Sequence, residues 1–150
     1  MRLTKFTDYS LRVLMYVAAA PEGRATIAEV AAAFDISESH LVKVVHFLGQ
    51  EGFLLNTRGR NGGLQLARSP REINIGRVVR ATEGRDHTAE CFDPEENTCK
   101  LAGRCRLQRA FEEAVERFYE VLQKYSLEDM RIGGARLERL LRWHPRGASQ

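Results

Sequence analysis

Hydrophobic residues recur at helical spacing in several separate segments of the chain. Two short helical patterns before residue 50 have their apolar residues at i, i+3, i+4 and i+7. These residues are Ile27, Val30, Ala31 and Phe34 in the first pattern, and Leu41, Val44, Val45 and Leu48 in the second. Thr26 and Glu29 match a capping box for the first helix, and Ser37 can cap the second. The pattern predicts a helix-turn-helix, with an ordinary αα-hairpin as the alternative.

A β-hairpin is predicted directly after the second helix. Gly52 can end that helix, and residues 53–57 and 64–67 have the composition of two short strands. The sequence RGRNGG at residues 58–63 is typical of a tight turn, because its glycines permit unusual backbone angles. A helix-turn-helix followed by such a hairpin predicts a winged-helix DNA-binding domain, whose partner would be a double-stranded DNA operator.

The candidate DNA-binding residues lie on the second helix and at the tip of the hairpin. Short or cationic side chains opposite the apolar face of the helix can reach base edges and phosphates, and arginines at the tip can meet phosphates or a minor groove. The candidates are Ser37, Ser39, His40, Lys43, Arg58, Arg60, Asn61 and Gly62. For His40, a plain solvated histidine is the alternative.

Three further helices are expected. One covers about residues 4–20 and another ends at Gly84, and both would pack under the recognition unit. Their inner faces consist of Leu11, Leu14, Met15 and Ala18 in one, and of Ile75, Val78, Val79 and Thr82 in the other. The longest periodic segment carries Leu107, Phe111, Ala114, Phe118, Val121 and Tyr125, widened by Ala110, Val115 and Leu122. Its apolar stripe is broad enough to predict a homodimer, with packing inside one chain as the alternative.

The predicted fold class is therefore mainly α with a small β-hairpin: a winged helix-turn-helix followed by a long dimerisation helix. The expected parts are the DNA-binding domain at 1–84, a cysteine-bearing loop at 85–106, the dimerisation helix at 107–128 and a C-terminal tail at 129–150. No signal peptide is recognisable, and no segment approaches the about twenty apolar residues of a membrane span. We therefore expect a cytoplasmic protein with no membrane partner.

The charge distribution supports DNA as the partner. The net charge is only +3, but residues 52–71 contain four arginines and no acid, whereas residues 86–98 contain five acids and no lysine or arginine. The basic segment coincides with the predicted wing, where it can neutralise phosphates, although short charge runs are also common in solvated loops.

All three cysteines of the chain, Cys91, Cys99 and Cys105, fall within the acidic loop and its end. An odd number of cysteines in a reducing compartment argues against a disulfide framework. Thiolates are soft ligands that suit iron–sulfur clusters, Zn²⁺ or Cu(I), and three of them leave one ligand position open. Their spacing does not identify the metal, and a zinc site completed by His87 is an alternative.

Nothing beyond these cysteines indicates catalysis. The sequence has no phosphate-binding glycine motif, no nucleophile elbow and no convincing acid–base pair. A thiol-based or cluster-based redox enzyme is thus the weaker alternative, and the chain is expected not to be an enzyme.

The order of these features resembles the bacterial iron–sulfur regulator family that contains IscR and NsrR. The residues that carry the resemblance are LTKFTDYSLR at 3–12, RGRNGGL at 58–64, ATEG at 81–84 and the three cysteines. IscR-like members have a histidine three residues after the last cysteine, where this chain has Gln108. NsrR-like repressors use an aspartate early in the first helix, donated by the partner subunit, and Asp8 matches that position.

The resemblance implies a repressor that senses nitric oxide through a 4Fe–4S cluster held by Cys91, Cys99, Cys105 and Asp8. An IscR-like regulator with a 2Fe–2S cluster is the alternative within the family. From the residues alone, Asp8 would not be preferred over Glu90 or His87 as the fourth ligand.

Overall fold

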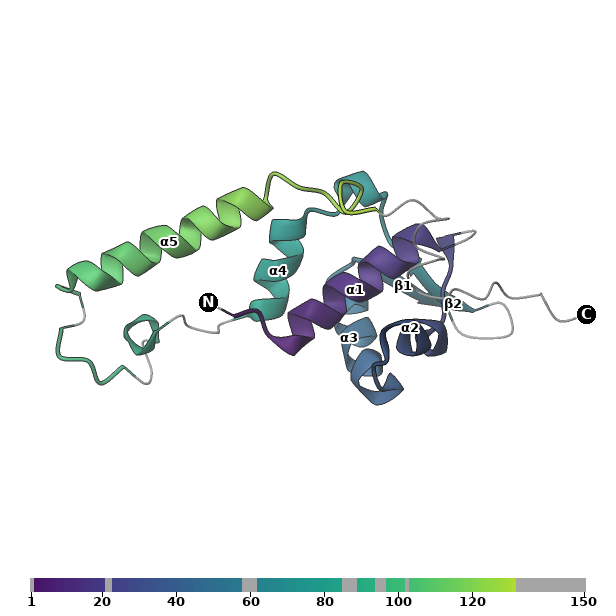
Figure 1. The fold of residues 1–150 in the computed structure, drawn as a ribbon, viewed down its shortest axis with the longest axis horizontal. Helices are drawn as coiled ribbons and strands as arrows, with labels where there is room; N and C mark the ends of the chain where they lie inside the picture. The colour runs from purple at the N-terminus through teal and green to yellow at the C-terminus, as the bar shows by residue number, and fades with distance from the viewer. Residues whose placement is uncertain are drawn as a thin grey trace, which may run out of the picture.

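The computed structural model describes residues 2–20, 23–57, 62–84, 89–93, 97–101 and 103–131. Helices α1 (Lys5–Ala19), α2 (Ile27–Phe34) and α3 (Glu38–Gln50) precede the strands β1 (Leu54–Thr57) and β2 (Gly63–Leu66). The 3-10 turn η2 (Pro70–Glu72), helix α4 (Ile75–Glu83), the 3-10 turn η3 (Glu90–Phe92) and helix α5 (Arg106–Leu122) follow. As Figure 1 shows, α1 to α4 and the hairpin form one body, from which α5 extends to one side.

The helix-turn-helix is confirmed. Thr26 and Glu29 form the predicted capping box, and Asp35 adopts a left-handed conformation that ends α2 and turns the chain into α3. The four predicted core residues of α3 are all buried, namely Leu41, Val44, Val45 and Leu48. Ser37 occupies the N-cap position of α3, but its side chain lies 3.2 Å from the hydroxyl of Ser39 and does not cap the helix backbone.

The predicted wing is present as an antiparallel pair in which Leu54 lies opposite Leu66. Ala25 adds a bridge to Leu64, with hydrogen bonds of 2.7 Å and 3.1 Å between their backbones. This close approach requires a glycine at position 63, because a Cβ there would lie 2.9 Å from the carbonyl oxygen of Ala25. The wing is thereby fixed to the segment that leads into α2.

Helices α1 and α4 pack against each other in the body. The predicted face of α4 is confirmed, since Ile75, Val78, Val79 and Thr82 are all buried. In α1 the prediction is only partly right: Leu14 is buried, whereas Leu11, Met15 and Ala18 are half-buried. The residues that are buried beside Leu14 are Thr7, Ser10, Val13, Tyr16 and Val17. The buried face is therefore rotated, because α1 is covered by both α3 and α4.

Helix α5 ends at Leu122, earlier than the predicted range 107–128, so Tyr125 lies beyond the helix. The amide of Asn74 donates to the carbonyl oxygens of Gln123 and Tyr125 at 2.7 Å and 3.3 Å, and the N–H of Leu127 donates to the carbonyl of Ile73. Leu127 is fully buried. The chain after α5 thus returns to the body, which holds this end of α5 against α4.

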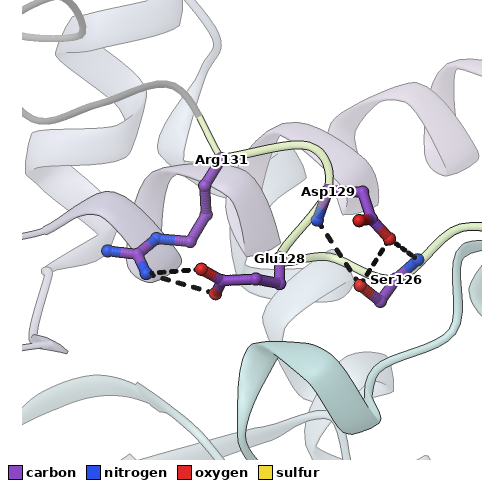
Figure 2. A network of polar contacts seen from close by, with 4 residues as sticks. All are labelled: Ser126, Glu128, Asp129 and Arg131. Carbon is purple, nitrogen blue, oxygen red and sulfur yellow. Dashed lines mark hydrogen bonds and ion pairs between the residues drawn. The ribbon is translucent and has the colours of Figure 1, made fainter.

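The returning segment is stabilised by short-range polar contacts (Figure 2). The carboxylate of Asp129 accepts hydrogen bonds from the N–H and the hydroxyl of Ser126, and Arg131 pairs with Glu128 at 3.0 Å. These hydrogen bonds lower the pKa of Asp129. None of the described helices is long and apolar enough to cross a membrane.

Candidate nucleic-acid interface and cysteine loop

The solvent-facing side of α3 carries the predicted recognition residues. Ser37, Ser39, His40 and Lys43 are all exposed, on the side of the helix opposite its buried leucines and valines. The ring of His40 lies 6.4 Å from the ring of Tyr9 on α1. The helix therefore presents polar and cationic groups on a surface whose position is set by α1.

The tip of the wing was predicted to carry Arg58, Arg60 and Asn61, and these three residues lie outside the described part of the chain. Gly62, the fourth predicted residue of the tip, is half-buried directly before β2. Arg68 is exposed just after β2 and extends the basic segment beyond the hairpin.

The three cysteines lie on the connection between α4 and α5, and all are free thiols. Cys91 is half-buried in η3, Cys99 is exposed, and Cys105 is half-buried at the N-cap position of α5. Among the residues that the structure describes, no group of three or more Cys, His, Asp or Glu side chains is arranged to hold a metal ion. In a single chain the three thiols are thus free to bind a metal but are not gathered into one ligand group. His87, the alternative ligand, lies outside the described residues.

A polar contact links the two sides of the cysteine loop. The carboxylate of Glu90 accepts hydrogen bonds from the hydroxyl and the N–H of Thr98, at 2.5 Å and 2.7 Å. These two bonds lower the pKa of Glu90, the bond from the hydroxyl contributing most. Because Glu90 and Thr98 directly precede Cys91 and Cys99, the contact holds the backbones that carry these two thiols near each other.

The side chain of Gln108 makes hydrogen bonds to the turn before α5 and within α5. Its side-chain oxygen accepts a 3.0 Å hydrogen bond from the N–H of Gly103, and its amide group donates to Glu112 at 3.3 Å. The side chain therefore stabilises the turn before α5 and the first turns of the helix.

Asp8 lies in the first turn of α1, next to the helix-turn-helix. Its carboxylate makes a two-pronged contact with Arg12, with N–O distances of 2.8 Å and 3.1 Å. The guanidinium of Arg12 in turn lies 5.6 Å from the ring centre of Phe34, the last residue of α2. Asp8 also lines a cavity of about 560 Å³ together with Arg2, Lys5, Arg12 and Asp35.

Sequence patterns did not reveal how α1 contacts the recognition helix. The ring of Phe6 packs edge-on against Phe47 of α3 at 5.2 Å, next to the pair formed by Tyr9 and His40. Phe6 and Tyr9 lie on either side of Asp8 in the sequence. The start of α1, which carries Asp8, therefore packs directly on α3.

Comparison with known proteins identifies the family. The family model Rrf2, described as an iron-dependent transcriptional regulator, matches residues 3–131. The chain belongs to the Rrf2 family. This Rrf2 regulator is 43% identical to the HTH-type transcriptional regulator NsrR of Halalkalibacterium halodurans, over 97% of this chain and all of that one. It is 48% identical to the protein of the same name from Geobacillus kaustophilus, over 95% of this chain and 97% of that one.

Solved structures agree with this assignment. The global cysteine regulator CymR of Bacillus subtilis superposes with a TM-score of 0.64 at 26% identity, covering 87% of this chain and 95% of CymR. IscR of T. potens gives a TM-score of 0.69 at 24% identity, covering 87% of this chain and 85% of that one, and this likeness concerns the fold. The Rrf2 chain is thus an NsrR-type, winged-helix transcriptional regulator, and as a member of a family of regulators it is not an enzyme.

The donor set of this Rrf2 chain fits an iron–sulfur cluster. Cys91, Cys99 and Cys105 are all free, accessible at least in part, and carried by one connection between two helices. Thiolates are the ligands that such clusters use, and a cluster bound by three of them needs one more ligand. The chemistry of the side chains therefore suits the cofactor, even though one chain by itself does not assemble the site.

Proposed function

We propose that the chain is a dimeric repressor that senses nitric oxide through an oxygen-ligated 4Fe–4S cluster. Cys91, Cys99 and Cys105 of one subunit would hold the cluster, and Asp8 of the other subunit would provide the fourth ligand. When bound, such a cluster supplies an iron with a hard oxygen ligand, at which nitric oxide can react. The observation that carries the proposal is the contact of Asp8, through Arg12, with the helix-turn-helix.

The side chains of this chain explain how such a ligand would control DNA binding. Asp8 has two oxygens, both of which contact Arg12, and Arg12 lies over Phe34 at the end of α2. If Asp8 binds a different group, its ion pair with Arg12 changes, and the position of the turn between α2 and α3 changes with it. Since two half-sites are about 34–36 Å apart, a small rotation of the recognition helices lowers operator affinity.

The surface of α5 supports a homodimer. Leu107 is 60% exposed and Phe111 is 37% exposed in the part of α5 that extends away from the body (Figure 1). Toward its other end the helix packs on α4, where Arg80 lies 4.1 Å from the ring centre of Tyr119 and 3.6 Å from Glu116. An apolar stripe on the extending part is suited to a second copy of the same helix, and a two-fold dimer matches a two-fold operator.

Two other cofactors remain as alternatives with different expected results. An IscR-like 2Fe–2S site needs a ligand at position 108, but Gln108 is engaged with Gly103 and Glu112. A zinc site closed by His87 would give a colourless protein that is insensitive to nitric oxide.

The test uses the 150-residue chain, purified anaerobically. Its DNA ligand is a duplex that the cluster-loaded wild type selects from random sequences, and we call this duplex the selected operator. We expect a straw-brown protein that binds this duplex as a dimer and releases it after addition of nitric oxide. Metal and sulfide analysis distinguishes 4Fe–4S from 2Fe–2S and zinc. A colourless, zinc-containing protein whose DNA affinity ignores nitric oxide would overturn the proposal.

A further inference from the structure

The end of α4 is fastened to the start of α1 by a side chain that the proposed function does not use. Glu83, the last residue of α4, accepts hydrogen bonds from the backbone N–H of Thr4 at 2.9 Å and from the hydroxyl of Thr4 at 3.1 Å. One turn away, Thr7 donates a 2.8 Å hydrogen bond to Thr82. These contacts join residues that are 75 to 79 positions apart in the sequence.

Thr4 determines where α1 begins. It is the N-cap residue of the helix, and its side chain accepts a hydrogen bond from the N–H of Thr7. The N–H of Asp8 donates to the carbonyl of Thr4 at 3.1 Å. Glu83 therefore holds, through Thr4, the helical turn on which Asp8 lies.

Glu83 also stands at the base of the cysteine loop. Gly84 follows it with a φ of 60°, a conformation that favours glycine and turns the chain out of α4 toward the cysteines. Figure 1 shows the start of α1 beside this end of α4. One carboxylate thus connects the exit into the cysteine loop with the helix that carries Asp8 and, through Phe6 and Phe47, with the recognition helix.

We propose that Glu83 is a positioning residue that couples the cysteine loop of each subunit to α1 of the same subunit. The inference rests on the proposed function and deepens it. Because Asp8 would reach the cluster of the other subunit, Glu83 would also connect the two sensor sites of the dimer: the loop around one cluster would set the position of the ligand to the other.

Two substitutions separate the reach of this side chain from its charge. Glu83→Gln keeps an acceptor oxygen at the same distance and loses the charge, whereas Glu83→Asp keeps the charge and is one methylene shorter. In the apoprotein we expect amide hydrogen exchange at residues 4–8 to accelerate about fivefold or more in Glu83→Asp and to stay near the wild-type rate in Glu83→Gln. This measurement needs no cluster.

The second readout is the ratio of the affinities of cluster-loaded and apo protein for the selected operator. A merely structural role would lower both affinities equally and leave the ratio unchanged. We expect Glu83→Asp to lower the ratio by about fivefold or more, and Glu83→Gln to restore it to within about twofold of wild type. The matched control is Glu72→Asp, because Glu72 likewise accepts a hydrogen bond from a backbone N–H, that of Ser69, but lies away from the loop.

The outcomes separate this inference from the proposed function. A wild-type ratio of one would overturn the proposed function and the coupling with it. A wild-type ratio well above one that Glu83→Asp leaves unchanged would overturn the role of Glu83 alone. If Glu83→Asp does not fold, Thr4→Asp keeps an acceptor that caps the N–H of Thr7 but cannot donate a hydrogen bond to Glu83. An unchanged ratio in that variant would equally overturn the role.

Discussion

Thr7 and Thr82 share a 2.8 Å hydrogen bond between their hydroxyl groups in the buried contact of α1 with α4. The hydroxyl of Thr82 in turn donates to backbone carbonyl oxygens of α4, that of Val78 at 3.0 Å and that of Val79 at 3.2 Å. Both hydroxyls are therefore satisfied without water. Such a pair fixes the register of the two helices, because any sliding would leave a buried polar group without a partner.

The first prediction concerns this pair in the apoprotein. Thr82→Val keeps the volume but removes the 2.8 Å acceptor of the Thr7 hydroxyl, which then has only the 3.1 Å contact with the hydroxyl of Thr4. We therefore expect the free energy of unfolding to fall by about 1 kcal/mol. Thr7→Val combined with Thr82→Val should recover part of that loss, because both buried polar groups are then absent. Urea denaturation of the single and double variants measures the difference, and strictly additive effects would contradict a direct bond.

Local signals were enough to predict the helix-turn-helix. The capping box of Thr26 with Glu29 and the four apolar residues of α3 depend on neighbours within one or two helical turns, and all are confirmed. The rotated face of α1 could not be predicted in the same way. Thr7 and Ser10 are polar by composition, but Thr7 is buried because its partner Thr82 approaches from a distant part of the sequence.

The end of α5 could likewise not be predicted from local signals, because it depends on distant residues. Its apolar repeat continues to Tyr125, but the helix ends at Leu122. The amide of Asn74 donates hydrogen bonds to the carbonyls of Gln123 and Tyr125, and Leu127 is buried in the core. Gly76 permits this approach, because a Cβ there would lie 2.8 Å from the backbone nitrogen of Gln123. The candidate cysteine site depends even more on distant partners: the sequence identified the donors, but their assembly into a ligand group stays a prediction.

The second prediction concerns pH. Burial, with a smaller effect of the nearby Glu29, raises the pKa of Tyr16 from 10.0 to about 12. Folding thus favours the neutral phenol. The stability that Tyr16 contributes in this way is complete below pH 10 and is lost as the pH rises toward about 12. At about pH 11 we expect wild type to have lost about 1 kcal/mol more stability than Tyr16→Phe, relative to neutral pH. Parallel losses in urea denaturation of both proteins would contradict this.

The third prediction concerns the DNA surface. Arg58→Ala combined with Arg60→Ala should weaken binding to the selected operator and to unrelated DNA alike, and should reduce the slope of log affinity against log salt by about two. Lys43→Ala or His40→Ala should instead affect the selected operator more than unrelated DNA. Titrations at several salt concentrations test both statements. An unchanged slope in the double arginine variant would mean that the wing does not meet phosphates.

The fourth prediction concerns the exposed end of α5. Phe111→Glu places a charge in the apolar stripe, so we expect the dimer to dissociate at least about tenfold more readily. Arg109→Glu changes an exposed residue of the same helix outside the stripe and serves as the matched control. Sedimentation analysis of both variants gives the oligomeric state. If the Phe111→Glu chain is still a dimer at the concentration at which the wild type is a dimer, the stripe is not the dimer interface.

The last prediction concerns Asp8 as the proposed link between the cluster and DNA. Asp8→Ala should still assemble a cluster, because three thiolates dominate the affinity, and its visible absorption should persist with an altered shape. Its cluster-loaded affinity for the selected operator should fall about five- to hundredfold, toward that of the apoprotein. The physical reason is that Arg12 loses its carboxylate partner, so that the contact from α1 to Phe34 no longer depends on the state of the cluster.

Asp8→Asn is the informative companion, because it keeps the size of the side chain and one oxygen for Arg12 while lacking the negative charge. If ligation by a carboxylate is what matters, Asp8→Asn should behave like Asp8→Ala in the loaded state and like wild type in the apo state. Anaerobic binding measurements on all three chains decide this. Equal operator affinities of cluster-loaded wild type and Asp8→Ala would reject Asp8 as the link, and Glu90 and His87 would then be the ligands to substitute next.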